Sequence, residues 1–310
     1  MNAQTVRDWA EARGLRAAVL DVDALAAVQN RLETLRGAGA FNPRFFESYL
    51  SGFRYLRDSA VSDPRGLILV AAPRPAHVVV FRLPDRELEA VLPPTYVKYR
   101  PFSEELLDAL RADIGLATSD VDLLSAPLKT LSAAAGLIRF GRNNIGYAPG
   151  WGSYFQLVGF VTRFPLAPET APLGIEDRGL DACEGCDRCL RACPTGAITE
   201  ARFLLRAETC LTLASETYDL GPRPLRPAPH NCLMGCLVCQ EVCPVNKGLL
   251  KRERTGLVFP ASETEALLHD REEKEESLWT EIRAKFGTLG LTEDTRLFAR
   301  NMRLLLGLEA

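Results

Sequence analysis

All nine cysteines of this sequence lie between Cys183 and Cys243, and their spacing constrains the fold more than any other feature. The run CEGCDRCLRACP places Cys183, Cys186, Cys189 and Cys193 in the pattern C-x2-C-x2-C-x3-C, followed by a proline. This is a spacing for [4Fe–4S] clusters, in which three thiolates bind one cluster and the cysteine before the proline binds another. Two clusters are therefore predicted, whereas zinc more often uses two separated C-x2-C pairs.

A second run, CLMGCLVCQEVCP at residues 232–244, keeps only the last three cysteines of this pattern. A regular run needs a cysteine at position 233, but Leu233 stands there and Cys232 comes one residue earlier. Cys210 lies between the two runs. Two clusters need eight thiolates, so Cys210 and Cys232 compete for one place.

Composition indicates the class of protein and the compartment in which this site is found. The chain has 310 residues, 47% of them hydrophobic, and a net charge of −3, which is typical of a globular protein and shows no basic surplus for nucleic acid. The apolar runs are too short to span a bilayer, and the first residues do not read as a signal peptide. A cytoplasmic protein without membrane contact is expected, where disulfides are rare and cysteines more often bind metal.

Apolar periodicity predicts helices over residues 5–58, and over 103–115, 126–137, 262–286 and 293–307. Ser103 is a predicted N-cap, and Ser262 with Glu265 forms a predicted capping box. An aromatic stripe in the first region is expected to be core; it consists of Phe46, Tyr49, Phe53 and Leu56.

Strands are predicted within residues 66–84, interrupted by Pro73 and Pro75, and from Tyr154 onward. The proline-rich stretch 165–179 is the predicted domain boundary, and a second such stretch follows at 221–231. We expect three parts: an α/β cofactor and substrate domain (1–170), a double-cluster domain (171–250) and a helical C-terminal segment (251–310).

The motifs CEGCDRCLRACPTGAI, AETCLTLASE and GCLVCQEVCPVN together resemble the iron–sulfur region of epoxyqueuosine reductases. The upstream stretch SAPLKTLSAAAGLIRFGRNNIGYAPGWGSYFQLVGFVT is similar to a segment of the same family, and reductive dehalogenases carry a related stretch. The resemblance implies an α+β protein: a nitroreductase-like, corrinoid-binding α/β domain, a bacterial ferredoxin-like domain with two [4Fe–4S] clusters, and C-terminal helices.

The resemblance also implies which cysteines bind which cluster. One cluster would use Cys183, Cys186, Cys189 and Cys243. The other would use Cys193, Cys210, Cys236 and Cys239. Cys232 would then be the spare cysteine, a small buried apolar side chain.

In the upstream stretch, the resemblance implies a cobalamin site fed with electrons by the clusters. Arg142, Tyr147 and Tyr154 are the candidate catalytic residues, for holding an anionic group or donating a proton. The candidate cofactor-binding residues are Gly141, Asn143, Asn144, Gly150, Gly152 and Ser153.

One departure from the family affects the expected substrate. Epoxyqueuosine reductases carry an acidic residue, the presumed proton donor, directly before Ser-Ala-Pro, but this chain has Leu124 there and its nearest acid is Asp122. We therefore expect an iron–sulfur oxidoreductase that reduces a small organic substrate and accepts electrons from a donor such as ferredoxin or flavodoxin. The alternatives are epoxyqueuosine reduction on tRNA, disfavoured by Leu124 and the missing basic surplus, and a ferredoxin-type electron-transfer protein without substrate chemistry of its own.

Overall fold

The computed structural model describes residues 1–57, 59–166, 179–200, 204–218, 230–269, 276–291 and 295–308. The chain packs as two compact units, which differ from the three predicted parts. Unit 1 comprises residues 1–73 and 100–186, and unit 2 comprises residues 74–99 and 187–310. The predicted proline-rich boundary and the second proline-rich stretch lie almost entirely outside the described residues.

Unit 1 is built on a four-stranded antiparallel sheet with strand order β1-β2-β8-β5. Its strands are β1 (Arg16–Asp21), β2 (Gly66–Pro73), β5 (Val121–Leu123) and β8 (Phe155–Thr162), and a small hairpin pairs β6 (Arg139–Phe140) with β7 (Gly146–Tyr147). Its helices are α1 (Ala3–Glu11), α2 (Ala24–Gly37), α3 (Pro43–Phe45), the π-helical turn η1 (Phe46–Leu50), α4 (Tyr99–Ile114), α5 (Leu128–Ala134) and the 3-10 turn η2 (Asp181–Cys183).

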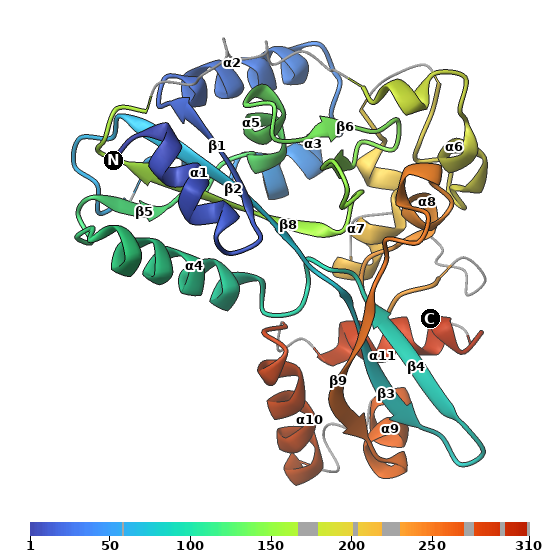
Figure 1. The fold of residues 1–310 in the computed structure, drawn as a ribbon. Coiled ribbons are helices and arrows are strands. Elements are labelled where there is room, and N and C mark those ends of the chain that lie inside the picture. The colour runs from blue at the N-terminus through green and yellow to red at the C-terminus, as the bar shows by residue number, and fades with distance from the viewer. Residues whose placement is uncertain are drawn as a thin grey trace. The chain divides into compact units, whose positions relative to one another are not determined.

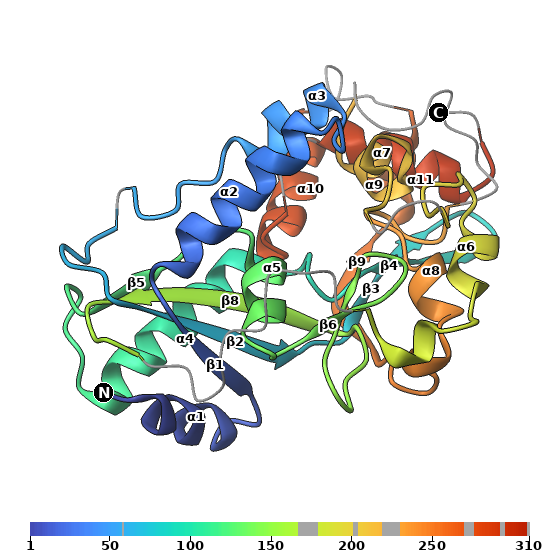
Figure 2. The ribbon, with the colours of Figure 1, turned by 90° about the horizontal axis from the view of Figure 1, so that it is seen from above.

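Helices cover both faces of this sheet. Side chains alternate between the faces along each strand, so each strand contributes to both cores. On β2, Leu67 and Leu69 pack with α2 and α5, whereas Ile68 and Val70 pack with α1 and α4. Figure 2 shows these helix pairs on opposite faces of the sheet. The result is a three-layer α/β unit, and β8 ends the segment that carries the predicted site.

Unit 2 contains a three-stranded sheet with strand order β4-β3-β9 (Figure 1). The strands β3 (Ala76–Arg82) and β4 (Glu87–Leu92) are antiparallel, and β9 (Arg252–Phe259) joins β3 in parallel. The longer helices are α9 (Ala261–Leu268), α10 (Glu276–Thr288) and α11 (Thr295–Leu305). The cysteine segments carry α6 (Arg188–Ala192), η3 (Ala207–Thr209), α7 (Leu211–Glu216), α8 (Val238–Glu241) and η4 (Pro244–Asn246).

The core of unit 2 is aromatic and contains one buried ion pair. Phe298 stacks on Phe286, and the ring of Phe259 packs against Phe286 at a tilt, in a fully buried cluster. Beside it, the Lys285 ammonium lies 2.5 and 2.6 Å from the two carboxylate oxygens of Glu263, whose side chain is 4% exposed. Such a pair is costly to break from the lysine side, because Glu263 alone would be a buried charge.

Several sequence predictions are confirmed and others are wrong. The helix α2, the strands flanking Pro73, and the strand beginning near Tyr154 are confirmed. The region 5–58 is not all helix, since β1 interrupts it and the last helical turn ends at Leu50. The core assignment holds for Phe46 but not for two members of the stripe, because Tyr49 and Leu56 are each 36% exposed.

Both predicted caps are wrong. Ser103 lies inside α4, where its buried hydroxyl accepts a hydrogen bond from the Gln156 side chain at 3.2 Å. Ser262 lies inside α9, whose N-cap is Pro260. The C-terminal segment also contains β9, which places it in a sheet rather than in helices alone.

Candidate iron–sulfur site

The first cysteine of the site is tied to the loop between α5 and β8. The Arg142 backbone N–H points at the Cys183 sulfur at 3.4 Å, and its guanidinium donates to the Cys183 carbonyl oxygen at 3.1 Å. Nearby, Arg139 forms a two-pronged ion pair with Asp181 at 2.7 and 2.8 Å and lowers the pKa of that carboxyl. The start of the cysteine segment is therefore fixed to unit 1 by the residues that precede Tyr147.

Of the cysteines assigned by resemblance to the first cluster, Cys183 and Cys186 belong to unit 1, and Cys189 and Cys243 belong to unit 2. Cys183 and Cys186 are held in a tight turn. The Cys186 N–H donates to the Cys183 carbonyl at 3.2 Å, next to Gly185 with a φ of 66° that favours glycine.

The cysteines assigned to the second cluster all belong to unit 2 and lie close together. Burial raises the pKa of the Cys239 thiol, and the neighbouring Cys236, Cys210, Cys189 and Cys193 raise it further. Burial likewise raises the pKa of Cys236, to about 11, and Cys210 and Cys193 add to the increase. Mutual electrostatic interaction of this kind requires short distances, so the four sulfurs of this set are neighbours, with Cys189 of the first set beside Cys239.

Backbone N–H groups surround two of these sulfurs. For Cys193, burial opposes the thiolate, but hydrogen bonds from Thr195 and Ile198 outweigh it and lower the pKa of the thiol. The N–H groups of Thr212 and Leu213 favour the thiolate of Cys210, although burial raises its pKa overall. Hydrogen bonds to cluster sulfurs are one of the means by which proteins set cluster potentials.

Within the described ranges, no three His, Cys, Asp or Glu side chains are arranged around a single metal position. In a [4Fe–4S] cluster each thiolate binds a different iron, so the ligand sulfurs are spread around the cluster.

The spare cysteine, Cys232, is fully buried and donates to the Asn231 side-chain oxygen at 3.4 Å. Burial raises the pKa of its thiol well above the usual range. Cys232 is thus buried as predicted, but it is hydrogen-bonded and not simply apolar.

Several of the predicted catalytic and cofactor-binding residues are buried and pack against one another. Tyr147 and Tyr154 are buried, and the Asn143 amide donates to the Tyr147 hydroxyl oxygen at 2.9 Å. Gly141 is required by this packing, since a Cβ there would lie 2.6 Å from the Tyr147 ring. Gly141 therefore makes room for the Tyr147 ring.

The remaining candidates shape the loop. Gly150 and Gly152 have φ values of 74° and 59°, and Asn144 has a φ of 60°, so all three occupy left-handed turn positions. Ser153 is buried. The Asp122 carboxylate accepts hydrogen bonds from the backbone N–H groups of Ala60 at 2.9 Å and Leu123 at 2.8 Å. These contacts hold Asp122 in the local backbone structure, so it does not replace the acidic residue that the family carries at position 124.

Leu124 packs in the core of unit 1, where a carboxylate would be buried. Sequence reasoning missed Arg139, Asp181 and Asn231, because nothing in their spacing marks them as neighbours of the cysteine turns. Among the helices of the described residues, none is long and apolar enough to cross a membrane.

Residues 182–246 match the family described as a 4Fe-4S double cluster binding domain. The chain therefore contains a double-cluster domain, attached to an α/β unit. This class of protein agrees with the predicted pair of clusters.

The relatives are more specific. The chain is 34% identical over 145 residues to epoxyqueuosine reductase of Bacillus subtilis, a match covering 47% of this chain and 35% of the relative. It is 35% identical over 149 residues to the enzyme of Burkholderia pseudomallei, covering 46% and 36%. The predicted resemblance to epoxyqueuosine reductases is confirmed, and the matches span about a third of these relatives' length.

Solved structures agree on the fold. A crystal structure of epoxyqueuosine reductase with a tRNA-Tyr epoxyqueuosine-modified stem loop matches with a TM-score of 0.64 at 21% identity. The match covers 98% of this chain and 80% of that structure. The mixed α/β fold is therefore shared across both units.

Proposed function

We propose that this chain is an iron–sulfur oxidoreductase of the epoxyqueuosine reductase type. Two [4Fe–4S] clusters would accept electrons from a donor such as ferredoxin or flavodoxin and pass them to a site at the loop 139–154. The contact of Arg142 with Cys183 carries this proposal, because it joins a predicted cluster ligand to the loop with the candidate catalytic residues.

The ligand sets follow the resemblance. The first cluster would use Cys183, Cys186, Cys189 and Cys243, and the second would use Cys193, Cys210, Cys236 and Cys239. Support for the second set comes from the electrostatic grouping of its members in unit 2.

We also propose that cobalamin binds at this loop, and one side chain, Arg142, supports this. The Arg142 Nε is buried and has no hydrogen-bond partner within the described part of the chain. This donor suits an acceptor brought by a cofactor, such as an amide oxygen of a corrinoid. Bound there, cobalamin would supply a reducing cobalt centre. Gly141 and Asn143 do not fit as direct contacts, since their space and their amide are used by Tyr147.

For the substrate, the comparisons favour the tRNA alternative over a free small molecule. The relatives are named epoxyqueuosine reductase, and one solved relative holds a modified tRNA stem loop. Reducing an epoxide needs two electrons and protons for the departing oxygen. With Leu124 in the core, Tyr147 and Tyr154 are the proposed proton donors, because a phenol can donate a proton and both lie in the loop next to Arg142.

The test uses the anaerobically purified protein with both clusters, cobalamin and reduced flavodoxin. It is incubated with tRNA carrying epoxyqueuosine, and in parallel with a small organic epoxide, and nucleosides are quantified by mass spectrometry. Loss of the epoxide oxygen from the tRNA nucleoside, absent in Cys183→Ser, supports the proposal. Full iron content without turnover of the tRNA would refute it.

A further inference from the structure

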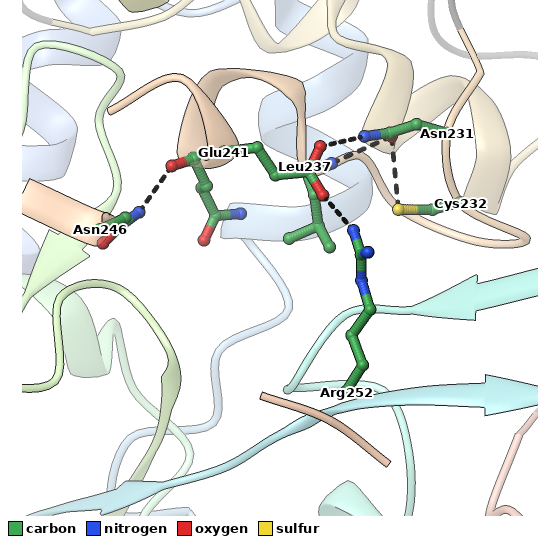
Figure 3. A network of polar contacts seen from close by, with 7 residues as sticks. Asn231, Cys232, Leu237, Glu241, Asn246 and Arg252 are labelled. Carbon is green, nitrogen blue, oxygen red and sulfur yellow. Dashed lines mark hydrogen bonds and ion pairs between the residues drawn. The ribbon is translucent and has the colours of Figure 1, made fainter. Parts of the chain in front are cut away.

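A polar network connects the spare cysteine to the helix that carries a predicted cluster ligand. The Asn231 side-chain oxygen accepts from the Cys232 thiol at 3.4 Å and from the Leu237 backbone N–H at 3.2 Å. Its amide donates to Glu241 at 3.2 Å, and Glu241 pairs with Arg252 at 2.7 Å. Figure 3 shows Asn231 between these groups.

The backbone on both sides of the network is also fixed. The Leu233 N–H donates to Val91 of β4 at 2.8 Å, and the side chains of Leu233 and Met234 are buried in the core of unit 2. The Gly235 N–H donates to the Ser215 hydroxyl at 2.7 Å. Position 233, where a regular cluster run needs a cysteine, is therefore used for the core.

Proximity alone does not exclude Cys232 as a ligand. Its thiol interacts electrostatically with that of Cys236, so the two sulfurs are neighbours. The difference lies in the hydrogen bonding: the Cys232 thiol donates to the Asn231 side-chain oxygen, which also accepts from the Leu237 backbone N–H.

We propose that Asn231 is a positioning residue for the second cluster. Its hydrogen bond holds the Cys232 side chain away from the iron, and its other two hydrogen bonds fix the Leu237–Glu241 turn so that Cys236 and Cys239 keep their places. The inference rests on the proposed ligand set, and it adds a residue that decides which of two neighbouring cysteines is available to iron.

The test is chelator-driven loss of iron from the anaerobic holoprotein. Asn231→Leu removes all three hydrogen bonds at similar size, and we expect release of the second cluster's iron to become about 10- to 100-fold faster, as for other residues that orient metal ligands. Arg252→Gln is the matched control, since it removes only the exposed outer ion pair. It should leave the release rate nearly unchanged.

A double variant separates positioning from general destabilisation. Asn231→Asp alone places a second carboxylate next to that of Glu241. In the double variant Asn231→Asp with Glu241→Gln, the glutamine amide can donate to the aspartate, so the hydrogen bond is restored in the opposite direction. The single variant should release iron quickly, and the double variant should return toward the wild-type rate. Release from Asn231→Leu within twofold of wild type, or no rescue in the double variant, would overturn the inference.

Failure of the proposed function gives a different result. If Cys210→Ser retains the iron of two clusters, the ligand set itself is wrong. If the ligand set holds and only the Asn231 variants behave like wild type, the role of Asn231 alone is refuted.

Discussion

Replacing Cys210 with serine should remove one cluster, whereas replacing Cys232 with serine should leave both. Each [4Fe–4S] cluster contains four irons, so the fully loaded chain should hold about eight iron atoms and Cys210→Ser about four. The structure supports this asymmetry, because Cys210 lies in the group formed with Cys193, Cys236 and Cys239, while Cys232 is bonded to Asn231.

Cys232→Ser should lower the free energy of unfolding slightly and should leave the iron content unchanged. The side chain is fully buried, but a serine hydroxyl can still donate to Asn231. We expect a loss of about 1 kcal/mol in the free energy of unfolding, which corresponds to a decrease of roughly 2 °C in Tm.

Iron and labile sulfide per chain are measured on anaerobically reconstituted protein, with electron paramagnetic resonance of the reduced state to count clusters. Cys210→Ala accompanies Cys210→Ser, since a serine oxygen is a conceivable iron ligand. Equal iron loss in the Cys210 and Cys232 variants, or greater loss for Cys232→Ser, would refute the assignment.

Three further predictions concern other parts of the two units. Arg142→Ala should keep both clusters but lower the reduction potential of the first by roughly 60 mV in a spectroscopic redox titration, since a cation beside Cys183 favours the more negative reduced cluster; an unchanged or higher potential contradicts this. Lys285→Met should lower the free energy of unfolding by about 3–5 kcal/mol because it leaves Glu263 as a buried unpaired charge, and adding Glu263→Gln should recover most of it in the same thermal denaturation. Burial raises the pKa of Glu216 above its usual 4.5, so the stability that this group contributes is present below pH 4.5 and is lost as the pH rises through the folded-state pKa. The Tm of wild type should therefore fall relative to that of Glu216→Gln as the pH rises above 4.5, and a constant difference would argue against the shift.

The sequence predicts the elements that local patterns determine. The helix α2 and the strands around Pro73 follow from periodicity and from proline, and the double cluster follows from cysteine spacing. These features depend on residues close together in the chain, so their signals are visible without the fold.

Other features depend on partners far away in sequence. Ser103 resembles a helix cap, but the helix begins earlier and its hydroxyl meets Gln156 of β8. Arg142 was predicted as a catalytic residue from the resemblance, yet its contact with Cys183 appears only when the loop and the cysteine turn are folded together. The role of Gly141 likewise depends on where the Tyr147 ring lies.

The parallel pairing of β3 with β9 has a consequence for biosynthesis. The side chain of Thr255 bonds to the carbonyl of Val78, 177 positions earlier, so both cysteine runs lie in the chain between two strands of one sheet. While the ribosome is still adding the cysteine runs, the β3 edge has no partner and is exposed to wrong pairing. Iron–sulfur assembly machinery that acts on the nascent chain would therefore meet the cysteines before their sheet is complete, and durable cluster insertion should follow the synthesis of β9.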